Sequence, residues 1–180
     1  RLAGNEDRSP VWKRIFMTIR FGILTLSDRS SRGERADTSG PALALLIQAR
    51  GWSVVKQEIL PDEESAIRAV LSEWADGGEL DVILTTGGTG FALRDVTPEA
   101  TRAVLQREAP GLAEAMRAES LKKTPHAMLS RAIAGIRART LIINLPGSPK
   151  GAVENLETIL PVLHHAVQLL QDDPSSEGSH

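Results

Sequence analysis

Three glycines, an aspartate and a threonine–proline pair follow a short apolar run within Asp81–Thr101. Gly87, Gly88 and Gly90 permit positive φ angles, and they lack the Cβ atoms that would keep a ligand away from the backbone. Backbone N–H groups presented in this way can bind a phosphate group. The segment Gly87–Gly90 therefore predicts an anion-binding loop, for which a tight turn is the structural alternative.

Neither of two common nucleotide-binding motifs fits this loop. A dinucleotide-binding fingerprint would need a third glycine at the position of Leu93. A Walker A motif is excluded as well, because two residues separate Gly147 from Lys150. Phosphate binding would therefore depend on another kind of loop.

Two aspartates are candidates for the chemistry itself. Asp95 lies in the loop after the glycines, and Asp62 follows the second apolar run. Mg²⁺ in proteins is often held by one or two carboxylates together with substrate phosphates, so either aspartate could serve that purpose. The structural alternatives are a turn carboxylate for Asp95 and a helix N-cap for Asp62.

Further polar residues near helix starts could bind an anion. Thr38-Ser39-Gly40 offers hydroxyl and N–H groups at a helix N-terminus, and Lys150 could contact a phosphate as a point charge. The structural alternatives are a helix cap for Thr38-Ser39-Gly40 and a solvated side chain for Lys150.

The arginines that could line an anionic pocket are Arg29, Arg32, Arg35 and Arg94. The histidines lack metal-ligand spacing, which favours surface or packing roles for His126, His164 and His165.

Strand and helix patterns alternate along the chain and must position these residues. Apolar runs predict buried strands over 21–26, 52–60, 82–84 and 140–145. Helical spacing predicts helices over 38–51, 61–77, 98–107, 112–121 and 153–170, the last with a break near Pro161. The stretch 128–136 fits either a helical turn or a strand. This alternation indicates an α/β fold, a three-layer α/β/α sandwich around a mostly parallel sheet.

The loops that follow the predicted strands should meet at one edge of that sheet. Right-handed crossovers bring the carboxyl ends of parallel strands together, and open α/β sheets bind ligands outside those ends. The loops begin near Ser27, Pro61, Thr86 and Asn144. The helix after the glycine loop should have Thr97 as its N-cap, with the following proline as its first residue.

The composition excludes several classes of function. The chain has 180 residues, a net charge of −2, 3% aromatic residues and no tyrosine, which argues against nucleic acid as a partner. Cysteine is absent, which excludes disulfides and cysteine nucleophiles and favours a reducing, cytoplasmic location. No apolar run approaches the ~20 residues of a membrane span.

We expect a single domain over 17–171, a flexible extension or cloning remnant over 1–16, and a flexible tail over 172–180.

Taken together, these motifs resemble the family of molybdopterin-binding and molybdopterin-adenylylating proteins, the MogA/MoaB type of fold shared by the gephyrin G domain. The resemblance extends from Ile19 to Leu170, and its motifs occur in the family's order. They are Leu26-Ser27-Asp28-Arg29, Asp37-Thr38-Ser39-Gly40, Pro61-Asp62-Glu63, Thr85-Thr86-Gly87-Gly88-Thr89-Gly90, Arg94-Asp95-Val96-Thr97-Pro98-Glu99-Ala100-Thr101, Leu129-Ser130-Arg131-Ala132 and Asn144-Leu145-Pro146-Gly147-Ser148-Pro149-Lys150.

The resemblance implies a molybdopterin adenylyltransferase of molybdenum cofactor biosynthesis, which transfers AMP from ATP to the molybdopterin phosphate with Mg²⁺ and releases pyrophosphate. It implies that Asp62 and Asp95 are catalytic, with Asp95 as the candidate Mg²⁺ ligand. It also implies a homotrimer and a downstream molybdenum-insertion protein as partner. The substrate- or nucleotide-binding residues that it implies are Ser27, Asp28, Ser39, Gly40, Thr86, Gly87, Gly88, Thr89, Gly90, Pro146, Gly147, Ser148 and Lys150.

Two other functions fit the same resemblance. One is a non-catalytic molybdopterin carrier of the MoaB-like branch, and the other is an oligomeric scaffold. Asp95-Val96-Thr97-Pro98 together with Pro146–Lys150 resembles the adenylylating branch, because the other branch tends to alter the segment around the Thr-Pro pair. A scaffold would need partner domains and a long linker.

Overall fold

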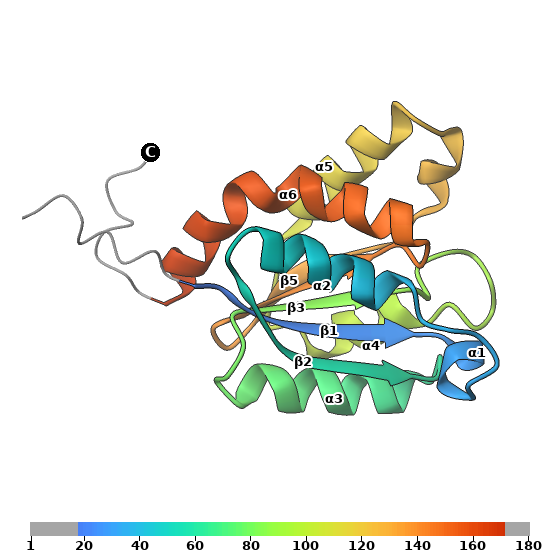
Figure 1. Cartoon of the computed structure of the whole chain (residues 1–180), viewed down its shortest axis with the longest axis horizontal. Coiled ribbons are helices and arrows are strands. Elements are labelled where there is room, and N and C mark those ends of the chain that lie inside the picture. The colour runs from blue at the N-terminus through green and yellow to red at the C-terminus, as the bar shows by residue number, and fades with distance from the viewer. Residues whose placement is uncertain (1–17, 172–180) are drawn as a thin grey trace, which may run out of the picture.

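Six strands form one sheet in the order β2-β1-β3-β6-β5-β4, in a computed structural model that describes residues 18–171 (Figure 1). β1, β2, β3 and β6 run parallel, whereas β5 is antiparallel to both of its neighbours. The predicted mostly parallel sheet is confirmed, and the expectations for 1–16 and 172–180 lie outside the described residues. The strands are β1 (Arg20–Leu26), β2 (Ser53–Leu60), β3 (Val82–Thr86), β4 (Arg107–Glu108), β5 (Ala134–Arg137) and β6 (Thr140–Leu145).

Helices cover both faces of the sheet, as the predicted three layers require. α2 (Ser39–Ala49), α5 (Pro110–Leu121) and α6 (Pro149–Leu170) lie on one face, and α3 (Glu64–Asp76) and α4 (Thr97–Val104) lie on the other (Figure 1). Two short helices, α1 (Asp28–Ser31) and the 3₁₀ helix η2 (Pro125–Leu129), belong to the connections. None of the helices in the described part of the chain combines the length and the apolar composition needed to cross a membrane.

The central strands are buried along their whole length because both faces of the sheet are covered. Their side chains alternate between two hydrophobic cores. In β3, Val82 and Leu84 belong to the core shared with α2, α5 and α6, and Ile83 belongs to the core shared with α3 and α4. β3 extends through Thr86, two residues beyond the predicted end of the strand.

A buried hydrogen-bond network joins these elements below the glycine loop. The Nδ2 amide of Asn144 in β6 donates to the hydroxyl oxygens of Thr85 in β3 and Thr101 in α4, each at 2.9 Å. Its Oδ1 atom accepts from the N–H of Ile133 at 3.3 Å. Because a buried amide is costly without partners, this network fixes the ends of β3 and β6 relative to α4.

The predicted break near Pro161 is wrong, because α6 continues without interruption from Pro149 to Leu170. Pro161 is exposed, whereas Leu160 and Leu163 are buried and hold the helix against the sheet on both sides of it. Because proline has no backbone N–H, only the carbonyl of Glu157, four residues before Pro161, loses its helical hydrogen-bond donor. Because Glu157 is also exposed, that carbonyl can bind water instead.

The predicted helix over 98–107 is too long at its C-terminal end. α4 ends at Val104, and the N–H of Gln106 donates to the carbonyl of Ile136, which starts the pairing of β4 with β5. The ambiguous stretch 128–136 contains both predicted kinds of structure, since η2 ends at Leu129 and β5 begins at Ala134. Local spacing did not reveal this pairing, because β4 has only two residues.

Candidate functional site

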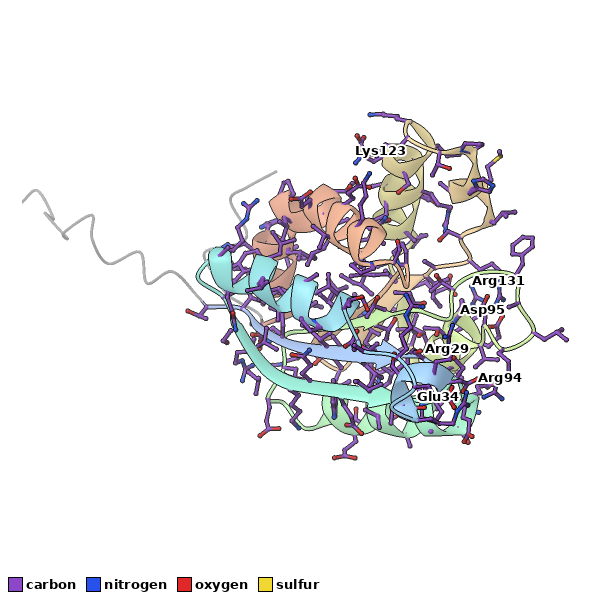
Figure 2. The ribbon with its side chains drawn as sticks, turned by 45° about the vertical axis from the view of Figure 1, so that its right-hand side comes forward. Arg29, Glu34, Arg94, Asp95, Lys123 and Arg131 are labelled. Carbon is purple, nitrogen blue, oxygen red and sulfur yellow. The ribbon has the colours of Figure 1, made fainter. Side chains whose placement is uncertain are left out.

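The predicted crevice exists at the carboxyl ends of the parallel strands. A cavity of about 390 Å³ lies there, enclosed by loops that follow β1, β2, β3 and β6. Figure 2 shows Arg94 and Asp95 on this side of the molecule, with Asp95 beside Arg131. This first cavity is lined by Thr25, Leu26, Ser27, Ser30, Arg35, Ala36, Asp37, Thr38, Ser39, Asp62, Thr86, Gly87, Gly88, Asp95, Gly147 and Ser148.

The glycine loop begins with two residues in the left-handed region. Gly87 has a φ of +105° and Gly88 has a φ of +64°. A Cβ atom on Gly87 would lie 2.3 Å from the carbonyl oxygen of Leu26. The close approach to β1 therefore requires glycine at position 87.

Thr97 holds the glycine loop instead of capping α4, which corrects the predicted N-cap. Its hydroxyl donates to the carbonyl of Gly87 at 2.9 Å, and its N–H donates to the carbonyl of Gly88 at 3.1 Å. The N-cap position belongs to Val96, one residue earlier. The loop turns back over the start of α4, and this brings a backbone acceptor within reach of the threonine.

The loop after β6 joins the glycine loop directly. The Thr86 hydroxyl donates to the carbonyl of Pro146 at 2.7 Å, and the N–H of Gly87 donates to the carbonyl of Leu145 at 3.2 Å. Within residues 18–171, the N–H groups of Gly88, Thr89 and Gly90 have no hydrogen-bond acceptor. Three consecutive backbone donors are therefore available to a ligand.

Asp62 pairs with Asp28 instead of capping α3, whose N-cap is Glu63. Oδ2 of Asp62 accepts from the N–H of Asp28 at 3.0 Å, and the N–H of Asp62 donates to Oδ1 of Asp28 at 3.0 Å. Oδ1 of Asp62 is the one buried side-chain polar atom without a hydrogen-bond partner in the described part of the chain. A Cβ atom on Gly88 would lie 3.1 Å from this oxygen, so it faces the glycine loop.

Burial raises the pKa of the Asp62 carboxyl above its ordinary value. The hydrogen bond from the Asp28 N–H opposes this shift, and the negative charges of Asp28 and Asp95 add to it. A half-buried carboxylate with one buried and unpartnered oxygen is typical of a functional site.

Arg94 forms an ion pair with Asp28 and so is not a free cation of the cavity. Its Nε and Nη2 atoms donate to the two carboxylate oxygens at 2.9 and 2.7 Å. These hydrogen bonds lower the pKa of Asp28 below its ordinary value. Of the four candidate arginines, Arg35 lines the first cavity, and Arg32 pairs with Glu34 at 2.7 Å.

Asp95 has the turn geometry that was its structural alternative, and it also lines the cavity. Its Oδ2 accepts from the N–H of Ala92 at 2.9 Å, which closes the turn after the glycines. Its carboxylate therefore belongs to both the loop and the cavity wall.

Asp37, which was not among the candidates, occupies the start of α2. Its Oδ1 accepts from the N–H groups of Ser39 and Gly40 at 3.0 and 3.1 Å, and from the Ser39 hydroxyl at 3.1 Å. Its Oδ2 accepts from Thr25 at 2.8 Å. The predicted free N–H groups of this helix start are therefore occupied. An aspartate directly before a predicted helix was the signal in the sequence.

A second cavity of about 330 Å³ lies on the other side of the glycine loop, toward α5 and α6. Ser148, the N-cap of α6, lines both cavities. Among the residues expected to bind substrate, Asp28, Gly40 and Lys150 line neither cavity. The second cavity is lined by Thr89, Gly90, Arg117, Ser120, Lys123, Thr124, His126, Ala127, Leu129, Ser130, Pro146, Ser148, Gly151, Glu154 and Asn155.

The environment of Asp62 leads to a prediction for stability against pH. A raised pKa means that the folded chain binds this proton more tightly than the unfolded chain does, so stability decreases as pH rises through the folded pKa. Asp62→Asn removes the ionisation and keeps an oxygen that can accept from Asp28. We expect the unfolding free energy of the variant, relative to the native chain, to increase as pH rises from about 4 toward neutrality.

Urea denaturation of both proteins at a series of pH values measures this difference. A difference independent of pH would show that burial of the Asp62 charge does not affect stability.

Comparisons with known proteins identify the family of this chain. The family model described as "Probable molybdopterin binding domain" matches residues 22–165. "Molybdenum cofactor synthesis protein cinnamon" of Drosophila melanogaster is 50% identical over 159 residues, which are 88% of this chain and 26% of that protein. This chain thus spans about a quarter of the length of that relative.

Two bacterial proteins match along most of their own length. "Molybdopterin adenylyltransferase" of Helicobacter pylori (strain J99) is 45% identical over 155 residues, which are 85% of this chain and 88% of that protein. The crystal structure of the molybdopterin biosynthesis enzyme MoaB from Thermus thermophilus has a TM-score of 0.82 and 56% identity. That match covers 87% of this chain and 99% of the other.

Proposed function

The chain belongs to the molybdenum cofactor biosynthesis family described as the probable molybdopterin binding domain, and on that premise we propose that it is a molybdopterin adenylyltransferase. The reaction transfers AMP from ATP to the phosphate of molybdopterin and releases pyrophosphate.

This proposal rests on one observation: the two cavities adjoin at the glycine loop. A transfer between two substrates requires their reacting phosphates to be held side by side. Gly88 lines the first cavity, Thr89 and Gly90 line the second, and Ser148 lines both. The free N–H groups of the three loop residues would bind the phosphates where the two substrates meet.

In this reaction the nucleophile belongs to the substrate. An oxygen of the molybdopterin phosphate attacks the α-phosphorus of ATP and forms a new P–O bond. The bond from the α-phosphorus to the oxygen that bridges to the β-phosphate breaks, and its electrons leave with pyrophosphate. The protein then contributes positioning and charge stabilisation, for which it needs neither a cysteine nor a serine nucleophile.

Asp62 and Asp95 are the residues that we propose as catalytic, and both line the first cavity. We assign Mg²⁺ and ATP to that cavity because the unpartnered Oδ1 of Asp62 offers a hard oxygen ligand there. No cluster of three or more potential ligand side chains exists among residues 18–171, so the phosphates would supply most of the remaining ligands. When bound, Mg²⁺ would neutralise charge on those phosphates.

The other binding roles are proposed on the same basis. The glycine loop, Thr86, Pro146, Gly147 and Ser148 would contact the phosphates and the substrates from the two cavity walls, with Ser27 and Ser39 on the nucleotide side. Asp28 and Gly40 would act through their neighbours, Asp28 on Asp62 and Gly40 on Asp37. Lys150 would contact only an extended substrate, because it lies exposed in the first turn of α6.

We also propose a cytoplasmic homotrimer that delivers its product to a molybdenum-insertion protein. The support is the family resemblance of the sequence motifs, together with the family model that matches residues 22–165. Sedimentation equilibrium would test the trimer.

Pyrophosphate release from ATP and Mg²⁺, measured with and without molybdopterin, tests the activity. We expect release only when molybdopterin is present, and omission of Mg²⁺ should abolish it. Bound molybdopterin without release would contradict the proposal.

A non-catalytic molybdopterin carrier is the second candidate, because the family model that matches residues 22–165 is described only as a probable molybdopterin binding domain. The carrier would bind molybdopterin, which titration calorimetry measures, but it would not make pyrophosphate formation depend on it. The same experiment therefore distinguishes the two functions.

A further inference from the structure

Arg131 contacts both ends of the loop that carries Asp95. Its Nε donates to the carbonyl of Gly90 at 2.7 Å, and its Nη2 donates to the carbonyl of Asp95. Its Nη1 donates to the carboxylate of Glu99 in α4. Figure 2 shows Arg131 beside Asp95, at the edge of the sheet where the strands end.

The backbone around Arg131 is itself held from two sides. Nη1 of Arg117 in α5 donates to the carbonyls of Ser130 and Ala132, each at 3.0 Å. The N–H of Arg131 donates to the carbonyl of Thr89 at 2.9 Å. The guanidinium therefore extends from a segment that is fixed to α5 and to the glycine loop.

The same segment is joined to the buried core. Ile133 donates its N–H to Asn144, whose amide belongs to the network below the glycine loop. The Asn144 side chain is fully buried, so the attachment of this segment is shielded from water.

The loop between Gly90 and Asp95 has little other support. Phe91 and Leu93 are 68% and 100% exposed, so they contribute no core packing. Within the turn itself, only Ala92 and Asp95 bind each other. The N–H of Ala92 donates to Oδ2 of Asp95, and the N–H of Asp95 donates to the carbonyl of Ala92, both at 2.9 Å. The ion pair from Arg94 to Asp28 also holds this loop, through two hydrogen bonds whose arginine side is exposed to water.

We propose that Arg131 is a positioning residue for adenylyl transfer, which fixes the Asp95 carboxylate at the wall of the first cavity. This inference rests on the proposed function, and it adds a residue that lines neither of the two cavities. A planar fork with five donors can bind two carbonyls and a carboxylate together, whereas lysine has only a point charge. Arg131→Lys therefore retains the charge and loses the geometry.

Arg137 provides a matched control away from the site. Its guanidinium also binds one carboxylate, that of Asp76, and one carbonyl, that of Val104. Arg137→Lys should therefore cost similar stability without moving the Asp95 loop.

Steady-state kinetics of the full-length variants tests the proposal. We expect Arg131→Lys to lower kcat at least about tenfold, with the KM for ATP within about threefold of native, because misplacement of a catalytic group acts mainly on the reacting geometry. Arg137→Lys should keep a kcat within about twofold of native. The kcat of the double variant Asp95→Asn/Arg131→Lys should lie within about twofold of the kcat of Asp95→Asn alone, because Arg131 acts through Asp95.

Equal loss of kcat in the two lysine variants would overturn the proposal. So would a full tenfold further loss in the Asp95→Asn background, since Arg131 would then act independently of Asp95.

Hydrogen exchange separates failure of this inference from failure of the proposed function. In Arg131→Lys, and not in Arg137→Lys, the amides of residues 90–96 should exchange faster while the amides of β3 and β6 keep their native rates. This readout needs no substrate, so it holds even if native protein releases no pyrophosphate. Unchanged exchange over 90–96 would show that Arg131 does not hold the loop.

Discussion

Asp95→Asn is expected to lower molybdopterin-dependent pyrophosphate release by at least about 10²-fold while leaving molybdopterin binding largely intact. Such a loss corresponds to about 2.7 kcal/mol of transition-state stabilisation. Asparagine has the same shape and can still accept from the N–H of Ala92, so the turn should persist. The charge beside Asp62, which we propose acts with Mg²⁺ and ATP, would be absent.

Glu63→Gln is the matched control for this prediction. Glu63 is exposed at the same edge of the sheet and lines neither cavity, yet its removal changes the net charge by the same amount. We expect turnover of this variant to stay close to native. Near-native turnover of Asp95→Asn, measured beside it, would remove Asp95 from the mechanism.

Gly87→Ala is expected to destabilise the fold by about 3 kcal/mol and to abolish binding of ATP. Residue 87 has a φ of +105°, and its Cβ would lie 2.3 Å from the carbonyl oxygen of Leu26. The neighbouring atom belongs to the backbone of β1, so no side chain can move aside to make room. The strand end or the loop would have to shift, and either would displace the free N–H groups of the loop.

Gly51→Ala separates conformational strain from the collision. Gly51 has a φ of +75°, and nothing lies within 4 Å of the position that its Cβ would take. We expect it to cost about 1 kcal/mol and to leave ATP binding unchanged. Urea denaturation and calorimetry of both variants measure these effects, and equal destabilisation would mean that Leu26 does not restrict position 87.

Much of the fold could be predicted from the sequence because the signals are local. The apolar run at Val82–Leu84 lies in a strand buried on both sides, and Gly51 ends α2 with the positive φ that its position predicts. Apolar runs and glycines depend on neighbours within a few residues. The position of the first cavity also follows from the rule for parallel strands.

Two capping interpretations were wrong because the polar side chain has a distant partner. A helix cap was the structural alternative for Asp62, yet its partner Asp28 lies 34 residues away. Thr97 was assigned to a cap as well, but its hydroxyl binds a carbonyl ten residues earlier. Local capping rules consider only backbone groups a few residues away. In the folded chain, Asp62 binds Asp28 and Thr97 binds the carbonyl of Gly87 instead.

Arg131 belongs to one of the motifs of the resemblance, but the partners of its guanidinium could be found only in three dimensions. Its three acceptors belong to the glycine loop, to the turn at Asp95 and to α4, 32 to 41 residues before it in the chain. Nothing in the spacing around position 131 connects it to those residues.

The pairing of β3 with β6 has a consequence for the order of folding. Their facing residues lie about 60 positions apart in sequence, as in the contact of Thr86 with Pro146. Contacts of such high sequence separation close large loops and form slowly. The glycine loop acquires its second wall only in that step, so a nascent chain has no complete ligand site until β6 has been synthesised and inserted beside β3. Ligand affinity therefore reports completion of the whole sheet, whereas helix content recovers earlier.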